Sequence, residues 1–119
     1  LLSLGEKLER ADFLVIKTGW EKYWNSEKYF SGFPCIDAEA AQLLVKFGKK
    51  GMAVDAISVD PVGEELEVHK ILLGSDNFII VENLCNLDCI HDDEFEFFAL
   101  PLKFENADGA PTRVVAQIR

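Results

Sequence analysis

The chain has 119 residues, of which 49% are hydrophobic and 28% charged, so it is long enough for one domain with a substantial core and is not a disordered protein. A formal net charge of −9 argues against nucleic acid and anionic membranes as partners, because both attract positively charged surfaces. No apolar run approaches the roughly 20 residues that cross a bilayer.

The first part of the chain predicts a weak helix, a strand and an aromatic segment. Residues 2–10 have a weak helical pattern, and residues 12–17 form an apolar run with β-branched side chains that predicts a buried strand. Residues 18–34 are crowded with aromatic side chains. Three of them are spaced for a short helix with one aromatic face: Trp20, Tyr23 and Trp24.

Residues 38–49 have the clearest helical pattern in the chain. Asp37 is placed as the N-cap, and lysines followed by Gly51 mark the end of the helix. Four apolar side chains would share the face that packs on the core: Ala40, Leu43, Leu44 and Phe47.

Two further strands with a helix between them are predicted next. Residues 52–58 and 78–82 are apolar runs with strand character. Residues 63–74 predict a helix that ends at Gly74, a natural C-cap. Its main stripe would contain Leu66, Lys70 and Leu73, with Val68, Ile71 and Leu72 nearby.

The last part of the chain predicts a β-hairpin. Residues 95–104 and 113–118 have strand patterns, and Asp108-Gly109 in the turn-rich segment between them suggests a chain reversal. The order of strand, helix, strand, helix, strand and hairpin indicates an α/β domain with a mixed β-sheet and packed helices. We expect all five strands to form one core, with the helix at 38–49 packed on it.

Two aspartates, Asp55 and Asp60, lie around the end of the second predicted strand. Ligands of α/β proteins bind beyond the carboxyl ends of the strands, so an aspartate there is a candidate site residue. The alternative is that Asp60 only caps the turn before Pro61. The spacing leaves both interpretations open.

Cysteines form a second candidate site, Cys85-x3-Cys89-x-His91, which could in principle bind zinc. The spacing is not that of a zinc finger or ribbon, and no second pair of ligands follows it. We therefore expect Cys35, Cys85 and Cys89 to be reduced and to hold no metal. An odd number of cysteines without scaffold-like spacing also favours a reducing, cytoplasmic setting.

His69 and Glu82 are stronger candidates for a site than the aspartates or the cysteines, because each lies at the end of an apolar run. A lone histidine on an apolar helix is more often a hydrogen-bonded core residue than a ligand. A buried carboxylate, however, costs several kcal/mol unless it is paired or bound to a metal. Imidazole and carboxylate are standard ligands of zinc and manganese, so one ion between them would offset both costs. Two ligands are too few for a complete site, and the sequence has no third of comparable quality.

Five segments, taken in order, resemble a known family. They are DFLVIKTGW, VDAISVDP, HKILLG, IIVENLCNLD and FFALPLKFENADGAPTRVVA. With these segments the chain is similar to the C-terminal half of the cyclase family of metal-dependent hydrolases, which includes bacterial kynurenine formamidases and isatin hydrolases. The resemblance extends over residues 1–119 and implies the family's swivelling β/β/α architecture, here as part of a single domain.

The resemblance also implies a metal site divided between two parts of the domain. The main motif of the family, His-x-Gly-Thr-His-x-Asp, is absent from the chain, which begins without Met and is expected to correspond to the part after that motif. His69 and Glu82 would complete the site of a divalent metal, zinc or manganese, from this side. The segment between them is about one residue longer than is usual, so Glu82 faces the site only if the loop absorbs the extra residue.

By the same resemblance, the metal would activate a water that attacks an amide carbonyl, such as an N-formyl group or a strained lactam. His69 would be a metal ligand or a proton shuttle. Asp60 would lie at the rim of the substrate pocket, and Trp20 would either form a wall for an aryl substrate or pack in the core. The family implies homo-oligomers, and the chain alone would be inactive without the N-terminal half. The alternative function is a non-catalytic, cyclase-like binding or assembly protein.

Overall fold

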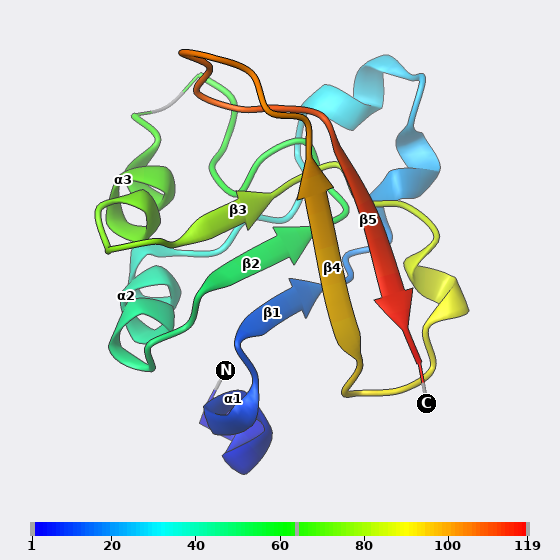
Figure 1. Cartoon of the computed structure of the whole chain (residues 1–119). Coiled ribbons are helices and arrows are strands. Elements are labelled where there is room, and N and C mark those ends of the chain that lie inside the picture. Colours follow the sequence, from blue (N-terminus) through cyan, green and yellow to red (C-terminus); the bar gives the residue numbers. More distant parts are fainter. Residues whose placement is uncertain (1, 64, 119) are drawn as a thin grey trace. The chain divides into compact units, whose positions relative to one another are not determined.

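The computed structural model of the chain describes residues 2–63 and 65–118. The chain divides into two compact units, Leu1–Leu87 and Asp88–Arg119. Figure 1 follows it in colour from blue to red. Among the described residues, no helix is long and apolar enough to cross a membrane.

The first unit contains a three-stranded parallel sheet in the order β1-β2-β3. Its strands are β1 (Phe13–Ile16), β2 (Gly51–Val54) and β3 (Ile79–Val81). Its helices are α1 (Glu6–Arg10), α2 (Ala38–Lys46) and α3 (Glu67–Leu73), with the 3-10 helices η1 (Leu2–Leu4), η2 (Trp20–Tyr23) and η3 (Glu27–Phe30). These elements confirm the α/β class and the strands predicted at 12–17 and 78–82.

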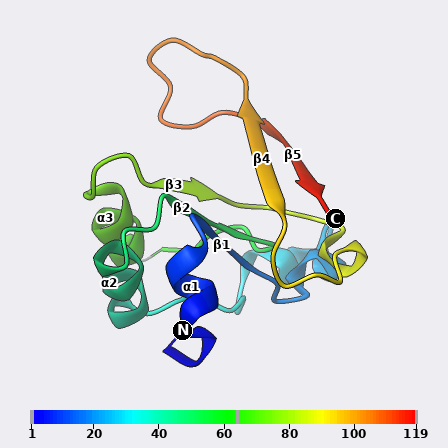
Figure 2. The ribbon, with the colours of Figure 1, turned by 60° about the horizontal axis from the view of Figure 1, so that its bottom comes forward.

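Helices α2 and α3 connect the three parallel strands and pack against each other (Figure 1, Figure 2). Crossovers between parallel strands are right-handed, so two successive crossovers in one direction place both helices on the same face of the sheet. The core lies between this face and the helices. Its fully buried side chains include Ala41, Leu44, Met52 and Leu72.

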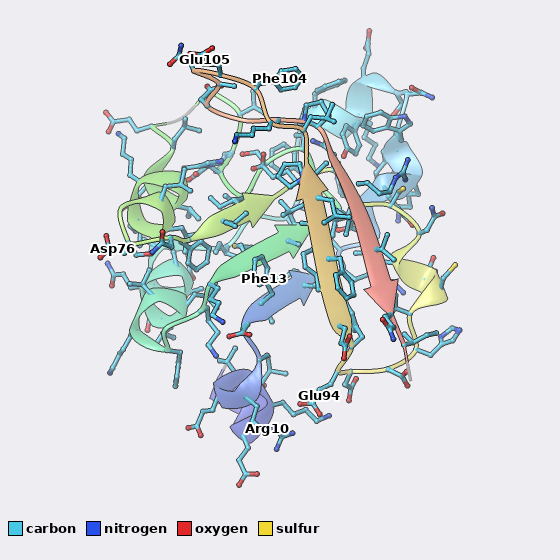
Figure 3. The ribbon with its side chains drawn as sticks, viewed as in Figure 1. Arg10, Phe13, Asp76, Glu94, Phe104 and Glu105 are labelled. Atoms are coloured by element: carbon cyan, nitrogen blue, oxygen red, sulfur yellow. The ribbon has the colours of Figure 1, made fainter. Side chains whose placement is uncertain are left out.

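Strand β2 begins with Gly51 because its neighbours leave no room for a side chain. The ring of Phe13 on β1, labelled in Figure 3, and the carbonyl oxygen of Ile79 on β3 would both clash with a Cβ atom at this position. The three residues are in register across the sheet. The glycine therefore allows the phenylalanine ring to lie across the middle strand.

Helix α2 confirms the predicted cap but ends earlier than predicted. Asp37 Oδ1 accepts a hydrogen bond from the N–H of Ala40 at 2.7 Å. The helix stops at Lys46, and Gly48 then takes a left-handed conformation with φ 65°. Lys49 and Lys50, which the sequence places at the end of the helix, therefore lie beyond it.

Lys49 is a buried cation, 7% exposed, that caps the C-terminus of α1. Its ammonium group donates hydrogen bonds to the carbonyl oxygens of Leu8, Glu9 and Ala11. The last carbonyls of a helix have no partner within the helix and carry partial negative charge, so a cation there satisfies both needs. Periodicity could not predict this contact, because it joins distant segments of the chain.

Replacing Lys49 by methionine is expected to lower the free energy of unfolding by about 2–3 kcal/mol, because charged hydrogen bonds are lost and carbonyls are left unsatisfied. Lys50 is the matched control. It pairs with Asp12 at 2.9 Å on the surface, so Lys50→Met should cost less than about 1 kcal/mol. Urea denaturation followed by circular dichroism measures both changes. Equal losses in the two variants would contradict the capping role.

The second predicted strand is shorter than the apolar run 52–58 suggests. Strand β2 ends at Val54, which pairs with Ile16, the last residue of β1. Strand β3 ends one residue earlier in the register, since its last residue, Val81, pairs with Ala53. Residues 55–60 have no strand beside them and form an irregular, largely buried loop.

Helix α3 begins at Glu67 rather than at residue 63, and Glu64 lies outside the described residues. Leu66 has a left-handed backbone with φ 46°, which cannot continue a right-handed helix and so sets its start. The stripe predicted through Leu66 and Leu73 is wrong, because these side chains are 48% and 55% exposed. The buried residues of the helix are Val68 and Leu72.

The second unit contains the predicted hairpin. Its strands are β4 (Glu96–Pro101) and β5 (Thr112–Gln117), and the short helix η4 (Leu87–Cys89) lies at the junction of the units. Among the described residues, the five strands form two sheets rather than the one mixed sheet expected from the sequence. The reason is local pairing: β4 and β5 are neighbours along the chain and pair with each other over all of their residues.

Candidate functional site

Three polar side chains meet where the strands of the first unit end. Asp60 lies in the loop after β2, Glu82 follows β3 directly, and His69 is on α3. Because β2 and β3 are parallel neighbours, the segments that follow them leave the same edge of the sheet. His69 lies between the two carboxylates and contacts both.

Asp60 is nearly closed off from solvent, with 3% of its surface exposed. Its Oδ1 accepts a hydrogen bond from the N–H of Val68 at 2.8 Å. Its Oδ2 accepts one from the N–H of His69 at 2.9 Å and lies 2.6 Å from His69 Nδ1. Burial by itself raises the pKa of Asp60, but the hydrogen bonds from His69 and Val68 outweigh it and lower the pKa below its ordinary value. Asp60 is therefore ionised at neutral pH.

The other ring nitrogen, His69 Nε2, lies 3.3 Å from Glu82 Oε1. The same oxygen accepts a hydrogen bond from the N–H of Val59 at 3.1 Å. Burial raises the pKa of Glu82, and His69 and the Val59 N–H oppose this only in part. The side chains of His69 and Glu82 are 22% and 25% exposed, against 4% for Asp60, so a ligand can reach this end of the site.

The structure confirms that His69 and Glu82 face each other from different elements. The longer segment between them does not turn Glu82 away. Asp60 lies behind His69, against Nδ1, and not at a rim beside both residues. It does not simply cap the turn before Pro61 either, because its carboxylate binds the first turn of α3. The roles of these residues as metal ligand, proton shuttle and substrate contact stay predictions.

Asp55, the other candidate aspartate, is fully buried and bound to the segment that follows β1. Its two oxygens accept hydrogen bonds from the Thr18 N–H, the Thr18 hydroxyl and the Gly19 N–H at 2.8, 2.6 and 2.7 Å. The carboxylate therefore ties the end of β2 to the end of β1. These contacts give Asp55 a structural role.

The aromatic segment forms two 3-10 helices, η2 and η3, instead of one short helix with an aromatic face. With three residues per turn, Trp20 and Tyr23 align, and their ring centroids lie 4.7 Å apart. Trp24 turns away and is 60% exposed. Trp20 packs against the core, and its indole N–H donates to the carbonyl oxygen of Tyr29 at 3.1 Å. Its contact with a substrate stays a prediction.

Tyr29 and Asn83, which hold the backbone next to Glu82, are missing from the candidates that the sequence provides. The Tyr29 side chain is buried, and its hydroxyl donates a hydrogen bond to Asn83 Oδ1 at 2.8 Å. Burial, followed by the charges of Asp55 and Glu82, raises the pKa of Tyr29, so it stays a neutral donor. Asn83 has a left-handed backbone, φ 61°. The one available signal is a turn-favouring asparagine directly after the glutamate.

The three converging groups do not form a metal site by themselves. Asp60 and Glu82 contact opposite nitrogens of the His69 ring, so they cannot share one ion with it. Across residues 2–63 and 65–118, no group of three or more His, Cys, Asp or Glu side chains is arranged to hold a metal ion. Cys35, Cys85 and Cys89 form no disulfide with one another in the described structure, and their reduced state stays a prediction.

Comparison with known sequences places the chain near one family. A family profile described as a putative cyclase matches residues 3–61. The chain is 37% identical over 111 residues to an uncharacterized protein of Methanocaldococcus jannaschii and 36% identical over 109 residues to the kynurenine formamidase of Bacillus cytotoxicus. These alignments include 92% and 91% of this chain but 56% and 50% of the two relatives.

Solved structures agree with the sequences. An isatin hydrolase bound to the product analogue thioisatinate matches with a TM-score of 0.76 at 27% identity, and a potential metal-dependent hydrolase with cyclase activity matches with 0.74 at 28%. The two matches include 87% and 88% of this chain and 44% and 50% of those chains. The chain therefore spans about half the length of the proteins it matches. In sequence and in fold, the chain is similar to part of the putative cyclases, of kynurenine formamidases and of solved metal-dependent hydrolases.

Proposed function

We propose that the chain supplies one side of the active site of a metal-dependent hydrolase that cleaves an amide bond. The substrate would be an N-formyl arylamine or a cyclic amide, attacked by a metal-activated water. The observation that carries the proposal is the approach of His69 Nε2 to Glu82 Oε1, 3.3 Å apart at the accessible end of the site. The resemblance to kynurenine formamidases and to an isatin hydrolase supports the choice of reaction.

The two donors and their spacing suit a divalent metal. Two ligands bound to one ion at about 2.0–2.2 Å, with tetrahedral or octahedral angles, lie roughly 3.0–3.5 Å from each other. The 3.3 Å between His69 Nε2 and Glu82 Oε1 falls in that range. Imidazole and carboxylate suit zinc or manganese, and a cation would stabilise the ionised carboxylate that burial disfavours.

The remaining ligands would come from outside these residues. A catalytic zinc site takes three protein ligands and a water. This part of the site offers two ligands, His69 Nε2 and the Glu82 carboxylate. The chain corresponds to 56% and 50% of two relatives, so a protein of their length has room for further ligands. By resemblance to the family, the His-x-Gly-Thr-His-x-Asp motif would supply them. The chain by itself would then bind metal weakly.

The chain's own residues would each have a defined task. When bound, the metal would supply a nucleophilic water and polarise the amide carbonyl. His69 would hold the ion through Nε2, because Asp60 occupies Nδ1. Glu82 would hold it through the carboxylate that the Val59 N–H orients. Trp20 would contact the aryl group of the substrate.

The test is an assay of N-formylkynurenine and isatin hydrolysis by the chain alone and by a completed protein. The completed protein joins this chain to the part of the Bacillus cereus kynurenine formamidase that it does not match. We expect no hydrolysis by the chain alone, and hydrolysis by the completed protein that a chelator abolishes. Hydrolysis by the chain alone would contradict the divided site. A completed protein that folds but neither binds metal nor hydrolyses these amides would favour a non-catalytic binding or assembly protein.

A further inference from the structure

The contacts of Asp60 point to a role in setting the chemistry of His69. We propose that Asp60 is a positioning residue that fixes the ring and the tautomer of His69, with the proton on Nδ1 and the lone pair on Nε2. The lone pair then faces Glu82 and any ion held there. The use of this tautomer in catalysis rests on the proposed function, but the tautomer itself can be measured in this chain without metal or substrate.

Asp60 is held in place by the backbone around it. Its own N–H donates a hydrogen bond to Ser58 Oγ at 3.0 Å. Its carboxylate accepts from the N–H groups of Val68 and His69 at 2.8 and 2.9 Å. These N–H groups belong to the first turn of α3 and have no partner inside the helix. Leu66 occupies the N-cap position and offers no side-chain cap, so Asp60 anchors the helix that carries His69.

The same carboxylate fixes the ring from its Nδ1 side. Asp60 Oδ2 lies 2.6 Å from His69 Nδ1, a short distance typical of a charge-assisted hydrogen bond. Carboxylates only accept hydrogen bonds, and the ring of a neutral histidine has one proton to donate. Asp60 Oδ2 lies 2.6 Å from Nδ1, whereas Glu82 Oε1 lies 3.3 Å from Nε2, beyond the usual hydrogen-bond length, so the proton belongs on Nδ1. In a neutral imidazole the lone pair is then on Nε2, the nitrogen that lies 3.3 Å from Glu82 Oε1. One aspartate thus sets the backbone position, the ring orientation and the tautomer of the histidine.

The chain offers two controls that separate this role from helix capping. Asp37 caps α2 through the N–H of Ala40 at 2.7 Å, and this cap involves no histidine. Asp37→Ala therefore removes a helix cap without touching an imidazole. His91 is the other histidine of the chain and is exposed in the second unit, so its signals serve as an internal reference.

The test is nitrogen-15 NMR of the imidazole nitrogens in the 119-residue chain at about pH 8, where a histidine of ordinary pKa is neutral. We expect His69 to carry its proton on Nδ1 in the wild type and to lose this preference in Asp60→Ala. The signals of His91 should be the same in both, and Asp37→Ala should leave His69 unchanged. An unprotonated Nδ1 in the wild type, or a His69 spectrum that Asp60→Ala does not alter, would overturn the proposal.

Asp60→Asn keeps the test decisive if Asp60→Ala does not fold. An amide has one neutral acceptor oxygen in place of two charged ones, so either Val68 or His69 loses its acceptor and any bond to Nδ1 is no longer charge-assisted. The preference for the proton on Nδ1 is therefore expected to weaken. In the completed protein, Asp60→Asn should also weaken zinc binding roughly 10–100-fold, the usual effect of removing a hydrogen-bond partner of a metal ligand. Asp37→Asn should leave zinc binding unchanged.

The outcomes distinguish the positioning role from the proposed function. A fixed tautomer in a chain whose completed form neither binds zinc nor hydrolyses amides would support the positioning role and overturn the proposed function. Normal zinc binding and hydrolysis in Asp60→Asn, with the wild-type tautomer retained, would support the proposed function and overturn the positioning role.

Discussion

Replacing His69 by alanine should lower the turnover of N-formylkynurenine by the completed protein by at least roughly 10³-fold. The substitution removes Nε2, the proposed metal ligand, and leaves the buried Asp60 carboxylate without its imidazole partner. Under the proposed function, loss of the ion would remove the activated water, so the loss should appear in kcat and not only in KM. Steady-state kinetics with metal in excess, together with the metal content of the purified variant, measures the effect.

His91→Ala is the control for the first prediction, because it removes the other histidine from an exposed position in the second unit. Its turnover should equal that of the wild type. Circular dichroism should show that both variants are folded. A His69→Ala protein that retains full turnover would contradict the assignment of His69 to the site.

The second large effect is expected in Glu82→Gln, which should retain zinc or manganese roughly 10–100-fold less tightly in the completed protein. Glutamine has nearly the same shape as glutamate, but it is neutral and a weaker ligand for these ions. Burial raises the pKa of Glu82, which means that the ionised carboxylate is disfavoured at this position. Removing the charge should therefore leave the metal-free chain as stable as the wild type.

Two measurements separate these effects of Glu82→Gln. Dialysis against graded chelator concentrations reports metal retention, and urea denaturation of the metal-free chain reports stability. Glu105→Gln is the control, since Glu105 is exposed on the loop between β4 and β5 (Figure 3) and should change neither quantity. Wild-type metal retention in Glu82→Gln would contradict its role as a ligand. Unfolding of the metal-free variant would assign Glu82 to stability instead.

Local sequence patterns predicted the elements that local forces determine. Asp37 was recognisable as an N-cap, because an aspartate before an apolar periodic run has an acceptor for the first free N–H groups. The β-branched run around Val15 and Ile16 predicted β1 for a similarly local reason. The hairpin of β4 and β5 followed from two strand patterns separated by a turn-rich segment.

The ends of elements and the pairing of strands depended on contacts between distant segments. Helix α2 ends at Lys46 with a left-handed Gly48 after it, and Lys49 beyond the helix binds the carbonyls of α1. Helix α3 starts late because Leu66 is left-handed and Asp60 supplies the missing cap. The division into two sheets follows from the pairing of β4 with its chain neighbour β5, and periodicity identifies strands without saying which of them pair.

Two residues of the candidate site could be predicted, because the sequence indicates that their ionisable side chains would be costly to bury. His69 and Glu82 stood out because ionisable groups at the ends of apolar runs are expensive to bury. The contact between Asp60 and Nδ1 was not predictable, because it needs a loop and a helix start to fold against each other. The bond from Tyr29 to Asn83 joins segments separated by 54 residues and has no local signal.

Anomalous diffraction from crystals of the completed protein grown with zinc or manganese tests most directly whether His69 and Glu82 share one ion. We expect a single strong peak within about 2.0–2.2 Å of both His69 Nε2 and a carboxylate oxygen of Glu82, with Asp60 still bound to Nδ1. A metal ion held elsewhere, with Nε2 and Glu82 in direct contact and no ion between them, would contradict the proposed site.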